Sequence, residues 1–130
     1  MFIANKVTSG ISVNNLALAK DFYTGLLGLH LDDDEMGLTL RLPNSGSLFM
    51  YEKQDHQPAN YTVLNFEVTS IDESVTALTE MGVVFESYDF GDGAKTDERG
   101  IMRGIAAHHG PDIAWFKDPS GNILSVLQNA

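Results

Sequence analysis

The same order of predicted elements occurs twice along the chain, and this repetition constrains the fold more than any other feature. Residues 7–13 alternate between apolar and small polar side chains, which is typical of a strand with one apolar face. Apolar residues in 16–26 then recur at helical spacing. Residues 61–69 and 71–81 repeat this strand and helix with an offset of 55 residues. The pattern therefore predicts two copies of one supersecondary unit.

Capping residues fix where the two helices begin. Asn14 or Asn15 can cap the first helix, because a short polar side chain accepts a hydrogen bond from an exposed N–H of the first turn. Ser70 and Glu73 have the spacing of a capping box before the second helix, and Gly82 provides its end. Each helix thus follows directly after a strand.

Three short strands are expected after each helix. We predict them at 29–33, 38–42 and 47–53 in the first copy and at 83–87, 112–117 and 123–128 in the second. The polar residues 54–60 connect the copies, and the glycine-bearing stretch 89–110 is expected to be a loop, with the character of a lid. The sequence predicts one α+β domain over residues 1–130, with βαβββ modules at 1–55 and 60–130.

Composition excludes several classes of function. The chain has 130 residues and no Cys, so it lacks disulfides, thiolate metal sites and a cysteine nucleophile. Its net charge of −10 repels nucleic acid and anionic lipid, and we expect neither as a partner. No apolar run approaches the roughly 20 residues of a membrane span, and the N-terminus lacks the apolar core of a secretion signal. A cytoplasmic protein is expected.

If each helix covers one face of its sheet, the opposite faces are available to a ligand. Alternation assigns a mixture of small, polar and apolar side chains to these uncovered faces, and that mixture suits a wet pocket better than a dry core. Transfer of register between the copies adds Arg41 and chooses Phe116 over Trp115 for the cavity. The predicted ligand-binding cavity contains Thr8, Ser12, Arg41, Met50, Glu52, Val63, Asn65, Glu67, Phe116 and Ser125.

Two segments resemble a known family. The segment ISVNNLALAKDFYTGLLGLHL is similar to the first strand and helix of the vicinal oxygen chelate superfamily, which includes glyoxalases, bleomycin-resistance proteins and extradiol dioxygenases. The segment IAWFKDPSGNILSVLQ resembles the last hairpin of that family, with its DPxGN turn. The resemblance implies a cup-shaped mixed sheet built from tandem βαβββ modules, small-molecule ligands and a homodimer.

The resemblance also implies four positions at which metal-using relatives carry His, Gln or Glu. Carried over to this sequence, these positions are Thr8, Met50, Val63 and Ser125. Such side chains are poor ligands for a divalent ion, so we predict neither a metal nor another cofactor. A register error of one residue would nominate Tyr51 or Phe49 and Leu64 instead, which are no better.

Two other side chains are compatible with an enzymatic function. Glu67 is a candidate general base on the predicted inner face, and His108 is a candidate acid–base group if the stretch 89–110 folds over the cavity. Glu52 and Arg41 are expected to pair with each other or to bind a charged ligand.

The leading prediction is a metal-independent protein that sequesters a small molecule, with a cationic aromatic compound favoured by the acidic charge. The alternatives are a lyase, isomerase or dioxygenase-like enzyme with a non-standard site at Glu67 or His108, and a domain whose cup serves only as a dimer scaffold. Whether the modules pair within one chain or across a dimer stays open at this point.

Overall fold

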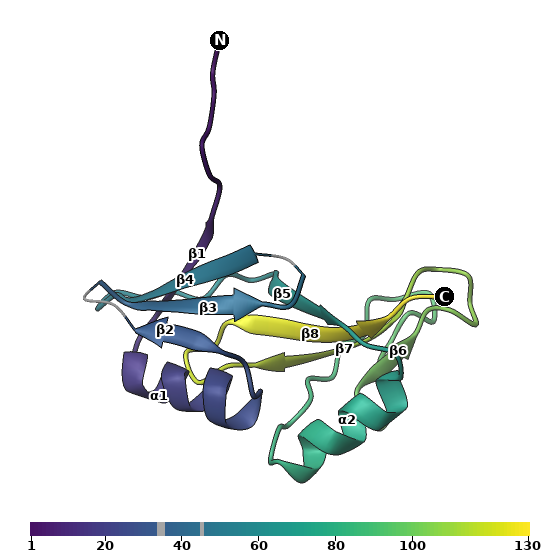
Figure 1. The fold of residues 1–130 in the computed structure, drawn as a ribbon. Helices are drawn as coiled ribbons and strands as arrows, with labels where there is room; N and C mark the ends of the chain where they lie inside the picture. The colour runs from purple at the N-terminus through teal and green to yellow at the C-terminus, as the bar shows by residue number, and fades with distance from the viewer. Residues whose placement is uncertain (34–35, 45) are drawn as a thin grey trace. The chain divides into compact units, whose positions relative to one another are not determined.

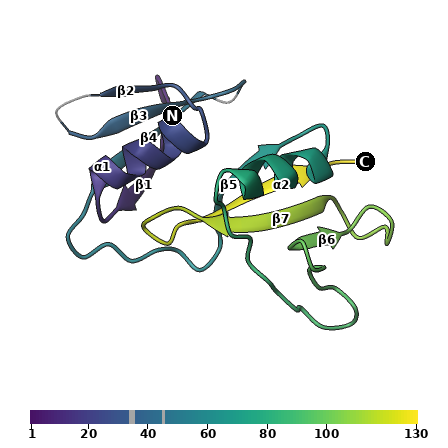
Figure 2. The same cartoon turned by 90° about the horizontal axis from the view of Figure 1, so that it is seen from below.

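The computed structural model describes residues 1–33, 36–44 and 46–130, and these form two compact units, residues 1–58 and 59–130. Each unit is one four-stranded mixed sheet with a helix against one of its faces (Figures 1 and 2). The prediction of an α+β fold made of two βαβββ modules is confirmed.

The first unit contains four strands and one helical segment. In chain order these are β1 (Ser9–Val13), α1 (Leu16–Lys20), its π-helical continuation η1 (Asp21–Leu26), β2 (Leu31–Asp33), β3 (Leu38–Leu42) and β4 (Gly46–Glu52). The strand order is β1-β4-β3-β2, with β1 parallel to β4 and the other pairs antiparallel. The apolar face of this sheet packs under the helix and buries Val13, Ala19, Tyr23, Leu38, Leu40, Leu48 and Met50.

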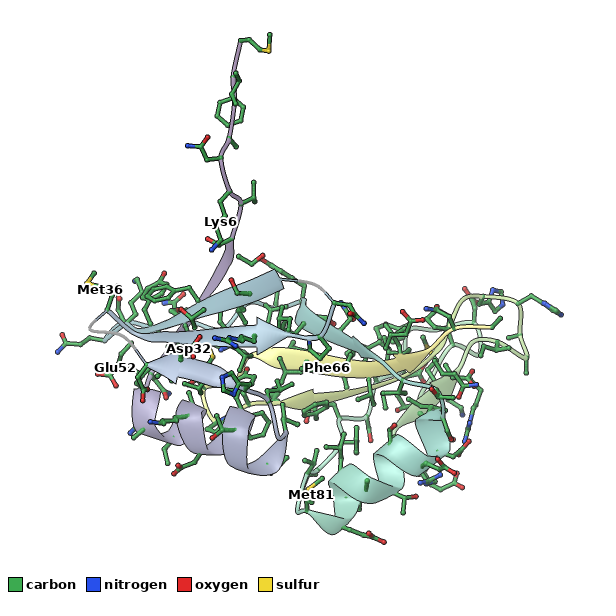
Figure 3. The ribbon with its side chains drawn as sticks, viewed as in Figure 1. Lys6, Asp32, Met36, Glu52, Phe66 and Met81 are labelled. Carbon is green, nitrogen blue, oxygen red and sulfur yellow. The ribbon has the colours of Figure 1, made fainter. Side chains whose placement is uncertain are left out.

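Two side chains cap the start of α1. Asn15 accepts a hydrogen bond from the Leu18 N–H at 2.9 Å, as one of the two predicted caps. Glu52, the last residue of β4, accepts a second one from the Leu16 N–H at 2.9 Å. Figure 3 labels Glu52 beside the start of this helix. The final strand of the unit thereby fixes the start of its helix.

The second unit repeats this topology. Its elements are β5 (Thr62–Glu67), α2 (Ile71–Glu80), β6 (Ile101–Arg103), β7 (Asp112–Lys117) and β8 (Ile123–Gln128), in the sheet order β5-β8-β7-β6. Ser70 caps α2 by accepting from the Glu73 N–H at 3.2 Å, as predicted. The core beneath α2 contains Ile71, Val75, Leu78, Ile101, Ala114, Phe116, Leu124 and Val126.

One strand lies elsewhere than predicted. Residues 83–88 are not a strand, and β6 occupies the edge of the sheet from within the stretch that was expected to be a loop. Residues 83–88 instead lie beside β7, to which they are joined by one backbone hydrogen bond: the Glu86 N–H donates to the Trp115 carbonyl at 2.8 Å. The chain then forms a separate hairpin before it returns as β6, which pairs with β7 over three residues.

Neither helix in the described parts of the chain has the length and apolar character that crossing a membrane requires.

Candidate functional site

Strand register shows which side chains share the uncovered face of the second sheet. Registered partners in neighbouring strands point to the same side, and the core residues identify the side that α2 covers. The opposite, uncovered face of this unit carries Asn65 and Glu67 from β5, Ser125 and Leu127 from β8, Ile113 and Trp115 from β7, and Met102 from β6.

The centre of this face is a hydrogen-bonded row across three strands. Ser125 is 0% exposed between its registered partners Asn65 and Trp115. Its hydroxyl donates to Asn65 Oδ1 at 2.6 Å. The indole Nε1–H of Trp115 donates to Thr62 Oγ1 of β5 at 3.1 Å, so the indole spans from β7 toward β5. The bond to Thr62 fixes the orientation of the indole relative to the sheet.

Two further rings surround the indole and form with it an aromatic cluster of Tyr88, Phe90 and Trp115. The Tyr88 and Phe90 rings lie edge-on to Trp115, with centroids 5.4 Å and 5.8 Å away. Burial raises the pKa of the Tyr88 hydroxyl, and the Glu86 carboxylate adds to the rise. Phe90 is 61% exposed, so the cluster presents open aromatic surface.

Tyr88 and Phe90 belong to a hairpin segment, residues 88–96. The Tyr88 carbonyl accepts from the Thr96 N–H at 2.9 Å, and the Phe90 N–H donates to the Ala94 carbonyl at 2.8 Å. Thr96 Oγ1 also accepts from the Tyr88 N–H at 2.9 Å. This part of the expected loop is therefore backbone-paired structure.

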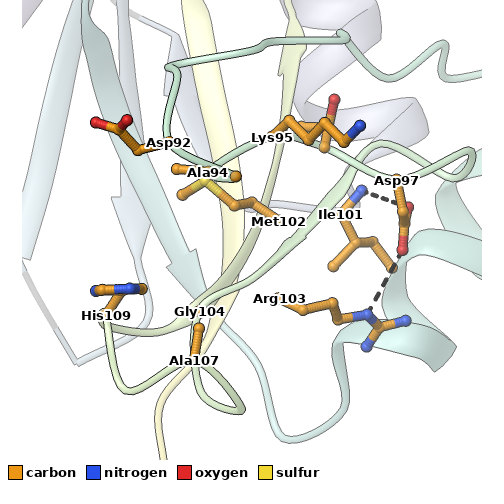
Figure 4. A pocket seen from close by; sticks show the side chains of 12 residues that line it. Asp92, Ala94, Lys95, Asp97, Ile101, Met102, Arg103, Gly104, Ala107 and His109 are labelled. Carbon is orange, nitrogen blue, oxygen red and sulfur yellow. Dashed lines mark hydrogen bonds and ion pairs between the residues drawn. The ribbon is translucent and has the colours of Figure 1, made fainter.

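A cavity of about 360 Å³ lies beside the hairpin segment (Figure 4). Residues 92–97 form one wall, and β6 with residues from the turn that follows it forms the other. His109 lines this cavity, whereas His108 does not, and the exposed His108 has a left-handed backbone with φ of 56°. Glu67 is exposed at the end of β5, beside Leu127.

The uncovered face of the first sheet is built differently. It carries Gly10 and Ser12 from β1, Thr39 and Arg41 from β3, and Ser47, Phe49 and Tyr51 from β4. The rings of Phe49 and Tyr51 stack with centroids 6.1 Å apart. Ser12 Oγ lies 2.6 Å from His56 Nδ1. Sequence reasoning missed this last pair, because no local pattern connects residues 44 positions apart.

Three residues predicted on the uncovered faces are not there. Met50 registers with Ile11 and Leu38 and is 0% exposed on the covered face. Phe116 registers with Leu124, is 1% exposed, and lies 5.6 Å from the Phe85 ring in the core. Trp115 takes the place that was predicted for Phe116.

Glu52 is the third wrong placement. It caps α1 and shares the covered face with Val13. The predicted pairing of Glu52 with Arg41 is also wrong, because Arg41 binds Asp32 Oδ2 through Nη2 at 2.9 Å and Nε at 3.1 Å.

A shift of one residue explains these errors. Met50 registers with Ile11 as Val126 registers with Phe66, so β4 and β8 correspond with an offset of 76 residues rather than the predicted 75. Side chains alternate along a strand, and a one-residue shift moves every side chain to the other face. Phe49 is therefore the residue of the first unit that corresponds to Ser125.

The remaining predicted residues have varied positions. Ser12, Arg41, Asn65, Glu67 and Ser125 lie on the uncovered faces of their units. Thr8 is exposed and precedes β1, and Val63 lies where the β5–β8 register shifts between Thr62 and Leu64.

The positions that metal-using relatives occupy with ligands do not fit a divalent ion here. With the corrected register they are Thr8, Phe49, Val63 and Ser125, and the Ser125 hydroxyl is already donated to Asn65. Hydroxyl, phenyl and aliphatic side chains do not replace imidazole or carboxylate donors. Within the described residues, no group of three or more His, Asp or Glu side chains is placed to hold a metal ion elsewhere.

Comparison with protein families identifies the class. The Glyoxalase/Bleomycin resistance protein/Dioxygenase superfamily matches residues 4–126, and the chain belongs to this superfamily. The resemblance found in the sequence is thus confirmed. Comparison with curated proteins gave no match.

Solved structures with the same fold come from several bacteria. TnmS3, an antibiotic binding protein from Streptomyces sp. CB03234, has 23% identity and a TM-score of 0.65, and the match covers 100% of this chain and 99% of that one. A superfamily member from Sphaerobacter thermophilus DSM 20745 has 24% identity and a TM-score of 0.65, covering 98% of each chain. The fosfomycin resistance protein FosX from Listeria monocytogenes has 12% identity and a TM-score of 0.66, covering 99% of this chain and 96% of that one. These likenesses show the fold.

Proposed function

We propose that this protein binds a planar, cationic aromatic small molecule without using a metal ion, and that the aromatic cluster is its main contact surface. The observation that carries this proposal is the composition of the uncovered face of the second unit. Trp115, Tyr88 and Phe90 gather there, while the family's metal-ligand position on the same face holds a fully buried serine.

Ring stacking supplies the attraction in this proposal. Aromatic pairs contribute about 0.5–1.5 kcal/mol beyond the area they bury. Phe90 is largely exposed, so a flat ligand that covers it removes apolar surface from water. The indole is already oriented by Thr62, so little conformational freedom is lost when the ligand binds.

Charge favours a cationic ligand. Residues 59–130 contain eleven Asp and Glu against four Lys and Arg. Three of those four cations bind acids of the same unit: Lys117 lies 3.2 Å from Glu86, and Arg99 and Arg103 bind Asp72. Glu67 is exposed on the same face as Trp115. A positive ring system gains from this field and from the faces of the aromatic rings.

The antibiotic binding named for TnmS3 is consistent with this function, since that protein shares the fold over the whole chain. In such a protein the ligand is held and left chemically unchanged. Asn65, whose Oδ1 is held by the buried Ser125 hydroxyl, would serve the polar edge of the ligand, and Met102 and Leu127 its apolar edge.

The only tryptophan of the chain lies in the proposed site, which makes its fluorescence a direct assay. We expect acridine orange, a planar cation, to quench Trp115 emission in a saturable way and to raise the melting temperature. Pyrenesulfonate, a planar anion, should bind at least about tenfold more weakly. Equal binding of the two probes would contradict the charge argument, and absence of saturable quenching by either would contradict the proposed site.

Variants distinguish the aromatic cluster from other exposed apolar residues. Phe90→Ala should raise the dissociation constant about fivefold to tenfold, because one stacking surface is lost. Met81→Ala is the matched control, since Met81 is 50% exposed at the end of α2 and outside the cluster. An equal effect of both variants would argue against the cluster.

We further propose a homodimer, on the basis of the family resemblance. Light scattering coupled to size-exclusion chromatography measures this, and a mass near the 14.2 kDa of one chain would contradict it.

A further inference from the structure

The hairpin segment is connected to helix α2 by a polar contact on the covered side of the sheet. The Asp72 carboxylate, in the first turn of α2, binds two arginines from the chain that follows the hairpin. Arg99 Nη1 donates to Asp72 Oδ1 at 2.8 Å, and Arg103 Nη2 donates to the same oxygen at 2.7 Å. We call these three residues the clasp.

Further hydrogen bonds make the clasp a network rather than a single ion pair. Arg99 Nη2 also donates to Thr76 Oγ1 at 2.6 Å, and Arg103 Nη1 donates to Asp72 Oδ2 at 3.1 Å. The hydrogen bond from Arg103 lowers the pKa of Asp72, and the same bond raises the pKa of Arg103. One carboxylate thus orients two guanidinium groups.

Asp97 joins the two arginines of the clasp to the end of the hairpin segment. Its Oδ1 accepts from the N–H groups of Arg99 at 2.9 Å and Ile101 at 3.0 Å, and its Oδ2 lies 3.6 Å from Arg103 Nε (Figure 4). Asp97 directly follows Thr96, which pairs with Tyr88 across the hairpin. Asp97 therefore links the clasp to the hairpin that carries Tyr88 and Phe90.

The cavity beside the hairpin segment makes this attachment important. It lies between residues 92–97 and β6, with Ile101 and Met102 in its lining, so the second arm of the hairpin lacks close packing along that side. The rings of Tyr88 and Phe90 hold the other arm against Trp115. A segment held at two places, one aromatic and one ionic, opens more readily when either is weakened.

We propose that Asp72 is a positioning residue for the ligand site: through Arg99 and Arg103 it holds the hairpin segment in the position that keeps Tyr88 and Phe90 against Trp115. The inference rests on the proposed function only for its consequence on ligand affinity. Its structural part, the control of the hairpin by Asp72, stands without a ligand.

The expected effect is partial opening of the hairpin rather than unfolding. The Asp72 side chain is 54% exposed, and the two arginines are 36% and 40% exposed. A single exposed ion pair contributes little to stability. A carboxylate that binds two guanidinium groups forms a network, and such networks contribute more. The apolar core of the unit beneath α2 contains none of the three clasp residues.

Asp72→Asn tests the proposal, with Glu73→Gln as its matched control. Both acids lie in the first turn of α2, so each substitution removes the same charge from the same helix end. Glu73 is outside the clasp. Asp72→Glu restores the carboxylate and should recover much of the wild-type behaviour.

Hydrogen exchange without ligand is the first measurement. Asp72→Asn should speed exchange of the Phe90, Ala94 and Thr96 amides about threefold to tenfold while β8 amides stay unchanged. Trp115 emission should shift to longer wavelength, because the surrounding rings leave it more often. Glu73→Gln should change neither. Unchanged exchange in Asp72→Asn, or equal exchange in both variants, would overturn the proposal.

Acridine orange affinity is the second measurement. The dissociation constant should rise in Asp72→Asn by about the factor seen in exchange, and less in Asp72→Glu. Faster exchange with unchanged affinity would overturn the positioning role. If the wild type binds no probe while Asp72→Asn still exchanges faster, the proposed function is contradicted, but the control of the hairpin by Asp72 is supported.

Salt provides a test that needs no variant. Raising NaCl from about 0.02 M to about 0.5 M should speed exchange of the same three amides in the wild type, because exposed charges are screened. If Asp72→Asn fails to fold, the salt series decides, and exchange that is independent of salt would overturn the clasp.

Discussion

The uncovered faces of the two units have the same backbone positions and different chemistry. In the first unit the central row is Gly10, Phe49 and Thr39, and in the second the corresponding residues are Asn65, Ser125 and Trp115. In the first unit the aromatic side chain of this row lies on β4. In the second unit it lies on β7, which is the counterpart of β3. The repeat therefore preserves the scaffold while the ring and the small residue exchange places.

The surroundings of the two rows differ because the connection after the helix has a different length in each unit. In the first unit β2 follows the helical segment after four residues, whereas twenty residues separate α2 from β6 in the second. This longer connection supplies Tyr88 and Phe90, so Trp115 is part of a cluster of three rings while Phe49 stacks with Tyr51 of its own strand. The longer connection is therefore what distinguishes the second unit, because it brings two more rings to the uncovered face.

The largest expected effect tests the assignment of faces. Phe116→Ala should lower the free energy of unfolding by about 3–5 kcal/mol, because Phe116 fills the core. Phe49→Ala, on an uncovered face, should cost about 1 kcal/mol. Urea unfolding of both variants measures the difference, and equal losses would mean that the covered and uncovered faces are wrongly assigned.

A second prediction concerns the long connection between α2 and β6. A Cβ at Gly100 would lie 2.7 Å from Phe85 Cβ, and the backbone there has φ of +84°. Gly100→Ala should therefore cost about 2–4 kcal/mol from clash and strain together. Gly91→Ala is the control, since Gly91 has φ of +87° with no atom within 4 Å of the added Cβ, and strain alone should cost about 1 kcal/mol. Equal melting temperatures for the two variants would contradict close packing at Gly100.

A contact that the two units share gives a smaller effect. Glu52 caps α1 through the Leu16 N–H, and Gln128 caps α2 through the Ile71 N–H, each at 2.9 Å. Replacing either with Ala should cost about 1 kcal/mol. Glu52→Gln should cost less, because the second unit already uses an amide at the corresponding position. A Glu52→Gln loss as large as that of Glu52→Ala would show that charge, rather than the shared hydrogen bond, carries the contact.

The smallest effect is a titration. The pKa of Tyr88 lies above its usual 10.0 because the side chain is half-buried and lies near the Glu86 carboxylate. This group stabilises the folded state fully below pH 10, and that contribution is lost as pH rises through the higher pKa of the folded state. Absorbance titration of the wild type against Tyr88→Phe should assign to Tyr88 an ionisation above pH 10. A difference centred at or below 10 would contradict burial of the hydroxyl.

Local signals predicted most of the fold. Ser70 and Glu73 define the start of α2, and the strands at 38–42, 112–117 and 123–128 have the observed bounds. The DPSGN turn is also local: Asp118 accepts from the Ser120 and Asn122 N–H groups, and Gly121 has φ of +84°. Such features depend on residues that are close together in the sequence.

The errors in strand placement and facing arose where contacts between residues distant in the sequence determine the structure. Gly46 and Gly121 suggested an offset of 75, but backbone pairing sets the register: the pair Arg41 and Ser47 corresponds to Lys117 and Ile123, so the offset is 76 and Gly46 corresponds to Asn122 rather than to Gly121. That one-residue difference moved Met50 and Phe116 to the wrong face. Strand β6 is three residues long inside a glycine-bearing stretch, where alternation gives no signal.

The indole N–H resonance of Trp115 gives the most direct test of the account, because the chain contains a single tryptophan and the spectrum a single such peak. Titration with acridine orange, followed by NMR, should move that peak saturably together with the Tyr88 and Phe90 amides, while the Phe49 and Tyr51 amides stay in place. A stationary indole peak, while the dye perturbs the first unit or nothing at all, would contradict the claim that the aromatic cluster binds the ligand.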